Sequence, residues 1–339
     1  MASSPPSTPS APATPSSASR VSAGASLEEA ALARASRKYD EEDLAAPSWA
    51  LHKKHIFVIS SAGKPIFSRY GDEGKLSALS GVLQALISFV HDSGGDAIRA
   101  VKAGRHRAVF LMRGPVYLVA VCCSGEPFEH LSRQLGFLHD QIISILTAKV
   151  DEIFAKNASC VESTAAFEPR RGRPCDGGHS LSLSRRYDLR GLLGGTDRLL
   201  RAAIHAGGTD PAMLLGAAPT LRMPPGTRAE LGRALAAAAP PEMLFGVLIA
   251  HNHVVAQVRP KKTALHPNDL LLLLSTVGSS ASFREDEAWL PICLPRFNAK
   301  GFLYAHVSFV EPRLVGGATA GTFTSGGGHF FTEGGGRFH

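Results

Sequence analysis

Apolar positions in the first part of the chain repeat in the order strand, strand, helix. Extended apolar runs at His55–Ile59 and Ile66–Tyr70 flank a turn at Gly63–Pro65, which predicts a β-hairpin. Asp72 and Glu73 then favour a helix N-terminus, because carboxylates cap and complement the positive end of a helix. The helix is predicted from apolar residues at three- and four-residue steps, namely Leu76, Leu79, Leu83, Leu86, Ile87 and Val90.

Three short apolar runs and a second helix follow. The runs are Ile98–Lys102, Ala108–Met112 and Val116–Cys123. The helix carries an apolar stripe of Phe128, Leu131, Leu135, Leu138, Ile142 and Ile145. Strands this close in sequence pair antiparallel, because a parallel crossover needs a dozen or more residues. Residues 49–150 are therefore predicted to form an antiparallel α+β module, although this order of elements also fits profilin-like and similar sensor folds.

A second, shorter series of the same kind is predicted near the C-terminus. Residues 187–240 form a helical connecting segment, with breaks expected at Gly194-Gly195, Gly207-Gly208 and Pro224-Pro225. Residues 241–312 then read as strand, strand, helix, strand, strand. These elements are expected at Met243–Ala250, Val254–Val258, Leu270–Val277, Glu287–Leu294 and Phe302–Val310. The module is partial, because a glycine-rich segment replaces any further strand.

Trp289 allows two interpretations within this second series. It lies in a predicted strand bracketed by prolines, where a single large aromatic residue is most often part of a core. The alternative is an exposed strand edge that pairs with another protein.

Composition changes the picture at the ends and in the middle of the chain. Residues 1–48, which begin rich in Ser, Pro and Ala, and the glycine-rich residues 313–339 are predicted to be disordered tails, because they offer too little apolar surface to bury. Residues 151–186 form a variable basic linker. Its arginines lack the interleaved aromatic residues that stack on single-stranded bases, so the net charge of +7 does not indicate nucleic acid. A solvated linker is favoured, and contact with an anionic membrane is the alternative.

Membrane-spanning and disulfide-bonded classes are not supported by the sequence. No segment reaches the roughly 18 uninterrupted apolar residues of a membrane helix, and the first residues do not resemble a signal peptide. The five cysteines form neither a disulfide framework nor the paired spacing of a zinc site. A soluble, cytoplasmic protein with reduced cysteines is expected.

The motifs of common enzyme classes are not found. The chain lacks GxxxxGK[ST], GxGxxG after a strand, GxSxG and HExxH, so we expect a non-catalytic protein with no cofactor and no metal. The tripeptide His251–His253 lies in a predicted hairpin turn rather than in a nuclease motif. Fourteen histidines are the only hint of a hydrolase, and nothing in the sequence places them together.

Several long stretches resemble the vacuolar-fusion SAND family. They are WALHKKHIFV (49–58), GKPIFSRYGDEGKLSALSGVLQALISFV (63–90), YDLRGLL (187–193), HPNDLLLL (266–273) and ASFREDEAWLPICLPRFNAKGFLYAHVSF (281–309). The resemblance covers most of residues 49–312, excluding the linker. It implies longin domains, each an antiparallel five-stranded sheet flanked by helices.

The resemblance also implies a function without bond chemistry. Members of the family pair with the calcium-caffeine-zinc-sensitivity protein, and the heterodimer is a guanine-nucleotide exchange factor for the Rab-seven-type GTPase of late endosomes and vacuoles. Such a protein is expected in the cytoplasm, with peripheral recruitment to those membranes. Paired first longin domains form the Rab platform, which places it within residues 49–150 here. The candidate partner-binding residues are Arg69, Tyr70, Asp72, Glu73 and Lys75, although capping and solvation explain these polar residues equally well.

The chain departs from the family after Val310. The final strand and helices of the second longin domain, and the whole third domain, are missing from the pattern, so an incomplete second domain is expected. Such a domain would expose a sheet edge and an apolar face. A longin-fold adaptor or scaffold without exchange activity is the alternative function.

Overall fold

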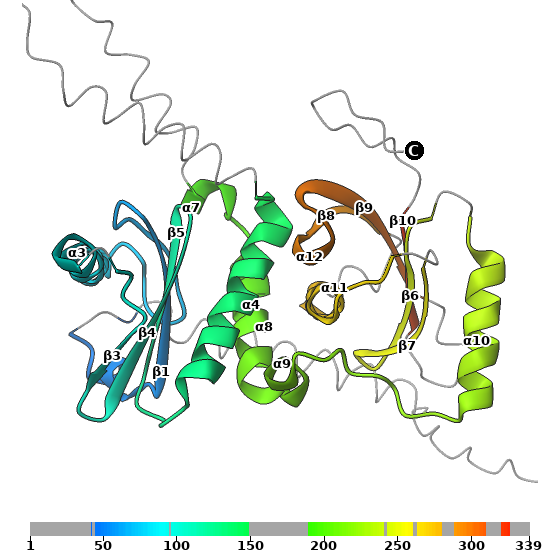
Figure 1. Cartoon of the computed structure of the whole chain (residues 1–339), viewed down its shortest axis with the longest axis horizontal. Helices are drawn as coiled ribbons and strands as arrows, with labels where there is room; N and C mark the ends of the chain where they lie inside the picture. Colours follow the sequence, from blue (N-terminus) through cyan, green and yellow to red (C-terminus); the bar gives the residue numbers. More distant parts are fainter. Residues whose placement is uncertain are drawn as a thin grey trace, which may run out of the picture.

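Two antiparallel sheets enclose a central layer of helices in the computed structural model of the chain (Figure 1). The structure describes residues 42, 45–94, 96–148, 189–240, 243–259, 263–279, 288–309 and 320–325. The predicted basic linker 151–186 lies outside these residues, as do most of the two predicted tails. The α+β class predicted from the sequence is confirmed.

The first sheet has five strands in the order β2-β1-β5-β4-β3, with each neighbouring pair antiparallel. Helix α3 covers its outer face and helix α4 its inner face (Figure 1). The short helix α2 precedes the sheet. The bounds are α2 Pro47–Leu51, β1 Lys54–Ser60, β2 Pro65–Ser68, α3 Ser77–Gly94, β3 Ala100–Ala103, β4 His106–Arg113, β5 Val116–Cys122 and α4 Phe128–Leu146. The predicted element order of the first module is therefore correct.

Helix α3 begins at Ser77, several residues after Asp72 and Glu73, where the sequence predicted its N-terminus. The Asp72 carboxylate accepts a hydrogen bond from the Gly74 amide at 2.5 Å, which closes a local turn. Such side-chain bonds compete with helical hydrogen bonding, so the helix begins at Ser77. Gly71 adopts φ +84°, and a Cβ there would lie 2.6 Å from the Glu42 carbonyl oxygen. This residue needs glycine both for its backbone angle and for that close approach.

The second sheet also has five strands, in the order β7-β6-β10-β9-β8. Strand β10 lies in the middle and pairs antiparallel with β6 and β9. Its residues were assigned to a disordered tail from their glycine-rich composition, and that assignment was wrong for these six residues. The new bounds are β6 Gly246–Ala250, β7 His253–Val258, α11 Pro267–Ser279, β8 Ala288–Leu294, α12 Pro295–Asn298, β9 Ala299–Phe309 and β10 Ala320–Ser325.

The glycine-rich segment can supply the central strand β10, because the hydrogen bonds between strands are made by backbone groups. Both edges of β10 are hydrogen-bonded to neighbouring strands, whatever its side chains are. The sheet is therefore not missing a strand, contrary to the expectation. No helix follows β10 among the described residues, so the second module is smaller than the first.

The predicted connecting segment 187–240 is divided between the two modules. Helix α8 packs beside α4 against the first sheet, and α10 packs on the outer face of the second sheet over β7 (Figure 1). Leu231 and Leu235 of α10 contact a cluster that contains Val255, and the Arg228 guanidinium donates to the Val255 carbonyl at 2.6 Å. Part of the face expected to be bare is thus covered. The bounds are α7 Leu189–Leu192, α8 Asp197–Thr209, α9 Pro211–Leu215 and α10 Pro225–Ala238.

One core joins the two modules. Leu271 and Leu272 of α11 belong to the same buried cluster as Leu135 and Leu138 of α4. Polar contacts reinforce this junction, because the Arg296 guanidinium donates to the Asp140 carboxylate at 3.3 Å. Helix α4 also contacts strand β8 of the second sheet. The central helices are therefore shared, and neither module is packed independently of the other.

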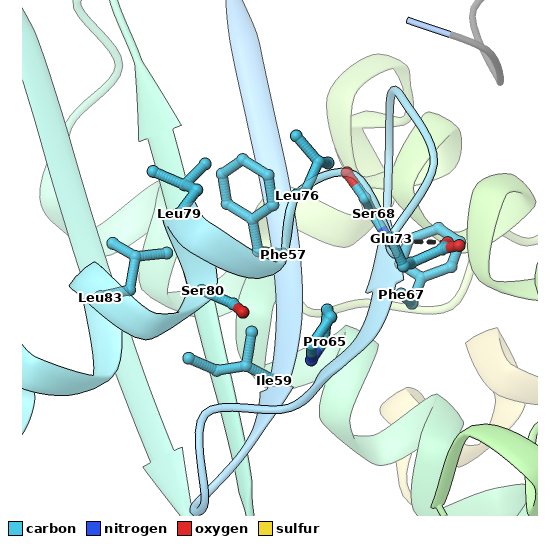
Figure 2. Close-up of a pocket in the computed structure, with 10 residues that line it drawn as sticks. All are labelled: Phe57, Ile59, Pro65, Phe67, Ser68, Glu73, Leu76, Leu79, Ser80 and Leu83. Carbon is cyan, nitrogen blue, oxygen red and sulfur yellow. Dashed lines mark hydrogen bonds between the residues drawn. The ribbon is translucent and has the colours of Figure 1, made fainter. Parts of the chain in front are cut away.

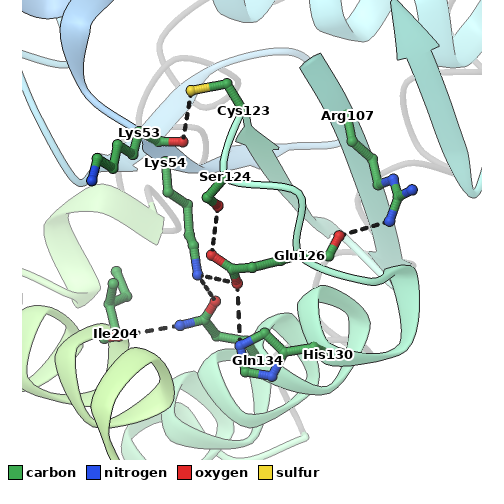
Figure 3. Close-up of polar contacts among 9 residues, drawn as sticks. All are labelled: Lys53, Lys54, Arg107, Cys123, Ser124, Glu126, His130, Gln134 and Ile204. Atoms are coloured by element: carbon green, nitrogen blue, oxygen red, sulfur yellow. Dashed lines mark hydrogen bonds and ion pairs between the residues drawn. The ribbon is translucent and has the colours of Figure 1, made fainter. Parts of the chain in front are cut away.

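A buried polar network fixes α4 and α8 against the first sheet (Figure 3). Lys54 of β1 is buried, and its Nζ donates to Glu126 Oε2 at 2.5 Å and to Gln134 Oε1 at 3.0 Å. Gln134 of α4 in turn donates to the Ile204 carbonyl of α8 at 3.2 Å. Burial alone would raise the pKa of Glu126, but hydrogen bonds from Lys54 and Ser124 outweigh it and the pKa is lowered.

Helix α8 includes Gly207 and Gly208, where a break was predicted, and ends at Thr209. The close contact of Gly207 with Gln134 explains why the helix continues this far. A Cβ on Gly207 would lie 2.8 Å from Nε2 of Gln134, whereas one on Gly208 would meet nothing within 4 Å. Glycine at 207 lets α8 approach α4 closely, and packing stabilises a helix that glycine alone disfavours. The predicted break is therefore present but displaced, because α8 ends at Thr209 and α9 begins at Pro211.

These two adjacent glycines give a matched test of the packing. Gly208→Ala should stabilise the protein by about 0.5–1 kcal/mol, because alanine is the better helix former. Gly207→Ala should destabilise it by about 1–2 kcal/mol, because its methyl group must displace the hydrogen-bonded Gln134 side chain. Urea unfolding followed by circular dichroism measures both changes. Equal effects of the two substitutions would contradict this account of α8.

Candidate functional site

Two of the predicted partner-binding residues lie just after β2, within an aromatic group. The ring of Tyr70 stacks on that of His52, with centroids 3.7 Å apart and planes 6° from parallel. The guanidinium carbon of Arg69 lies 5.0 Å from the centroid of the Tyr70 ring. The Arg69 carbonyl accepts a hydrogen bond from Arg201 of α8 at 2.9 Å. Both residues therefore link the end of β2 to neighbouring elements, while remaining partly accessible.

The other three predicted residues lie in the turn before α3. The Glu73 carboxylate accepts a hydrogen bond from the Ser68 amide at 3.2 Å. The Asp72 carboxylate accepts one from the Gly74 amide, as described above. Asp72 and Lys75 are exposed, and Glu73 is half-buried. The structure thus brings all five residues to one end of α3. Their contact with a partner stays a prediction.

Helix α2 contributes aromatic residues to the same group. Trp49 packs on His55 with ring centroids 4.1 Å apart, and His55 stacks on Phe57 of β1 at 6.0 Å. His52 Nε2 lies 2.7 Å from Glu42 Oε2. Burial, followed by the charge of His52, lowers the pKa of His55 to about 4. His52 and His55 therefore have packing roles, and His55 is neutral near pH 7.

A small apolar cavity lies between α3 and the β1–β2 hairpin (Figure 2). Phe57 and Ile59 line it from β1, and Leu79 and Leu83 line it from α3. Glu73 and Ser68 supply polar groups at its edge, and the Ser68 amide donates a hydrogen bond to the Glu73 carboxylate. Its lining contains no histidine or cysteine. The polar residues of its lining are Ser68, Glu73 and Ser80, and the rest of the lining is apolar.

An exposed apolar feature of the first module lies on α3. Val82 is 66% exposed, Leu86 36% and Phe89 69%, and their spacing of four and three residues puts them on one side of the helix. Leu83 and Ile87 are buried against the sheet, and the three exposed residues flank this buried stripe along one edge of the helix. We call Val82, Leu86 and Phe89 the α3 stripe. Helix α3 itself lies on the face of the first sheet that is away from the second module (Figure 1).

Sequence reasoning missed this stripe. It assigned Leu86 to the buried side of the helix, and the structure corrects that assignment. It did not consider Val82 or Phe89. The available signal was the breadth of the apolar pattern, because a helix on a sheet surface buries only one stripe. A helix with apolar residues on a second side is expected to have a second contact.

An open strand edge belongs to the same module. Strand β3 ends the first sheet, and β4 is its only strand partner among the described residues. Val101 of β3 packs against the cluster that contains Leu83 and Ile87, so β3 and α3 share one core. An open edge and an apolar helix side are the features through which sheets add a strand or a helix from another protein. We take the α3 stripe and the β3 edge together as the candidate interaction surface.

Other classes of site receive no support from the described ranges. No group of three or more His, Cys, Asp or Glu residues there could hold a metal ion. His251 has φ +49° and Asn252 φ +59°, as in the predicted hairpin turn between β6 and β7. Within the same ranges, no helix is both long and apolar enough to cross a bilayer.

Comparison with family models identifies both modules. Residues 54–202 match the first longin domain of FUZ, MON1 and HPS1, and residues 241–321 match the second longin domain of the same proteins. The first match ends within α8, and the second reaches β10. Both limits agree with the structure, which packs α8 on the first sheet and inserts β10 into the second.

Individual relatives carry names from vacuolar fusion. The chain is 42% identical over 287 residues to the vacuolar fusion protein MON1 homolog of Arabidopsis thaliana, which covers 85% of this chain and 42% of that protein. It is 40% identical to the human MON1 homolog A, over 80% of this chain and 38% of the relative. Protein SAND of Takifugu rubripes is 38% identical, over 80% of this chain and 47% of the length of that protein. The chain thus spans less than half the length of these relatives.

Because His55 is buried with a lowered pKa, the free energy of unfolding should decrease as the pH falls. The unfolded chain takes up a proton as the pH falls below about 6.5, whereas folded His55 does so only near 4, so stability should fall between these values. His55→Phe keeps an aromatic ring and should remove about 2–4 kcal/mol of this loss. Urea unfolding at stepped pH measures it. His91→Phe, at a ring 72% exposed, is the control and should leave the pH profile unchanged. An unchanged profile in His55→Phe would refute the assignment.

Proposed function

The chain belongs to the vacuolar-fusion SAND family of longin proteins, and on that premise we propose that it acts in vacuolar fusion as a non-catalytic subunit of a guanine-nucleotide exchange factor. The GTPase would be of the Rab-seven type, on late endosomes or vacuoles. The obligate partner would be the calcium-caffeine-zinc-sensitivity protein, joined through its own first longin domain. The protein would be cytoplasmic and recruited peripherally to those membranes.

The observation that carries this proposal is the α3 stripe. Val82 and Phe89 are each about two-thirds exposed in a module whose other large apolar side chains mostly lie in cores. Fully burying one such side chain contributes roughly 1.5–3 kcal/mol. A second longin domain placed against α3 and the β3 edge would cover the stripe and extend the sheet. Pairing of two first longin domains is therefore physically favoured at this surface.

Exchange activity would follow from binding alone. A factor that binds the nucleotide-free GTPase more tightly than the loaded one accelerates release of the nucleotide, without forming or breaking a bond in the factor. In this proposal Arg69, Tyr70, Asp72, Glu73 and Lys75 contact the GTPase. They lie in the segment that precedes α3, at the N-terminal end of the helix that carries the α3 stripe. Polar groups there could engage a GTPase that rests on both subunits.

A longin-fold adaptor without exchange activity is the second candidate. It is supported by the fold, because longin domains with an exposed apolar helix side account for partner binding without requiring nucleotide exchange. An adaptor would use the same α3 stripe to bind a partner. It would bind the GTPase equally well in either nucleotide state, or not at all, because only a difference in affinity between states drives release.

Substitution on the α3 stripe tests the proposal. The chain, its proposed partner and the GTPase loaded with fluorescent GDP are mixed, and the rate of nucleotide release is followed. The wild-type pair should accelerate nucleotide release. Phe89→Lys should weaken pairing by about tenfold or more, because it puts a charge in place of an aromatic side chain that pairing would bury. Release at limiting partner concentration should slow in proportion.

Leu215→Lys is the matched control, since Leu215 is 74% exposed on α9, away from α3. It should pair and exchange as the wild type does. If the wild-type pair forms but does not accelerate release, the adaptor function is the correct one. If Phe89→Lys pairs as tightly as Leu215→Lys, the α3 stripe is not the pairing surface.

A further inference from the structure

The open edge of the first sheet carries positive charge that nothing nearby neutralises. Arg99 precedes β3, Lys102 lies within it, and Arg105 lies in the turn that joins it to β4. All three side chains are exposed, and within the part of the chain that the structure describes none of them forms an ion pair. The sequence has no Asp or Glu between Asp96 and Glu126. We call Arg99, Lys102 and Arg105 the cationic edge.

The charges of the cationic edge emerge on both faces of the sheet. Val101 packs into the core beneath α3, and side chains alternate along a strand, so Lys102 lies on the opposite face. The Phe110 amide donates to the Arg99 carbonyl at 2.9 Å, and Phe110 belongs to the core beneath α3. Arg99 therefore lies opposite Phe110, on the α3 face. Each face of the open edge thus has a cation beside it.

This arrangement favours a protein strand over a layer of lipid headgroups. A strand added to β3 would place its own side chains on both faces, next to Arg99 on one and Lys102 on the other. It would also pair with the backbone N–H and C=O groups of the open edge, for which a lipid surface offers no regular row of partners. The charge of such a strand would have to be negative to be attracted.

The α3 stripe beside this edge cannot select a partner by charge. Helix α3 contains no Lys, Arg, Asp or Glu before Asp92, which lies in its last turn. The exposed residues Val82, Leu86 and Phe89 would fit another apolar helix, including the α3 stripe of a second copy of this chain. Selection must therefore come from residues around the stripe. The cationic edge is placed for this role, because β3 and α3 share one core.

We propose that the cationic edge decides which partner the α3 stripe accepts: it repels a second copy of this chain and selects a partner strand that carries Asp or Glu. Two copies joined at β3 would bring both cationic edges together, and like charges on paired strands are destabilising. Acidic residues on the partner would instead be attracted on both faces. The inference rests on the proposed function for the pairing surface, and it adds the chemistry of the partner at that surface.

The chain itself supplies the first test. An acidic-edge variant carries Arg99→Glu, Lys102→Glu and Arg105→Glu at exposed positions, so it should fold as the wild type does, which circular dichroism checks. In sedimentation velocity at micromolar concentration, wild type and variant should each stay monomeric. Their equimolar mixture should dimerise at least about tenfold more tightly than either chain alone, because opposite charges then meet. Phe89→Lys in both chains should abolish this dimer, which locates it at the α3 stripe.

Pairing with the partner of the proposed function supplies the second test, measured without the GTPase. The acidic-edge variant should pair about tenfold or more weakly than the wild type, and wild-type pairing should weaken as salt rises from about 0.05 to about 0.5 M. The matched control carries Arg222→Glu, Arg233→Glu and Arg259→Glu, exposed positions of the second module with the same change in net charge. It should pair as the wild type does.

Several results would overturn the inference. One is a mixture that associates no more tightly than the separate chains, and another is equal pairing of the acidic-edge variant and its control. Tighter pairing of the acidic-edge variant with the partner would show that the cations only guard the edge against association. Wild type that binds vesicles of phosphatidylcholine and phosphatidylserine through the cationic edge, and not the partner, would identify a membrane as the occupant.

Failure of the proposed function gives a different result. A pair that depends on the cationic edge but does not accelerate nucleotide release would refute exchange activity and support the inference. Exchange by a pair that is insensitive to the cationic edge would do the reverse.

Discussion

The burial of helix α4 from two sides is the constraint on which the rest of the structure depends. Leu131 and Leu135 pack against the first sheet, while the other side of the helix contacts β8, α11 and α12 of the second module. The helix also carries buried polar residues, and Gln134 is held by Lys54 and by the Ile204 carbonyl. Separating the modules would expose both sides of α4 to water. Each module therefore serves as part of the other's core.

This shared layer decides which surfaces are left for partners. The inner sides of both sheets face the central helices, so apolar groups there are already covered. Exposed large apolar side chains lie instead on helix α3, as the α3 stripe, and on strands β8 and β9, as Trp289, Phe302 and Tyr304. A partner that binds at either surface need not disturb the α4 junction. The shared central layer thus leaves these two groups of apolar side chains accessible.

The helices of the connecting segment show how packing overrides local propensity. Gly207 and Gly208 predict a break, yet α8 includes both and ends only at Thr209, because the missing side chain at 207 admits Gln134. Asp72 and Glu73 predict a helix start, yet the Asp72 side chain closes a turn and delays the helix to Ser77. In each case a contact between particular atoms changed the outcome. Propensity describes only the isolated segment.

The sequence by itself determined the two strand–helix series, the α+β class, the apolar stripe of α4 and the resemblance to a family, because periodicity and motifs are local properties of the chain. Of the candidate site, it located the Arg69–Lys75 segment but not the α3 stripe, since burial depends on how many sides of a helix have neighbours. Only the tertiary structure decided that β10 completes the second sheet, that the connecting segment belongs to both modules, and that Trp289 is exposed. These features depend on pairing and packing between residues far apart in sequence, which no local pattern records.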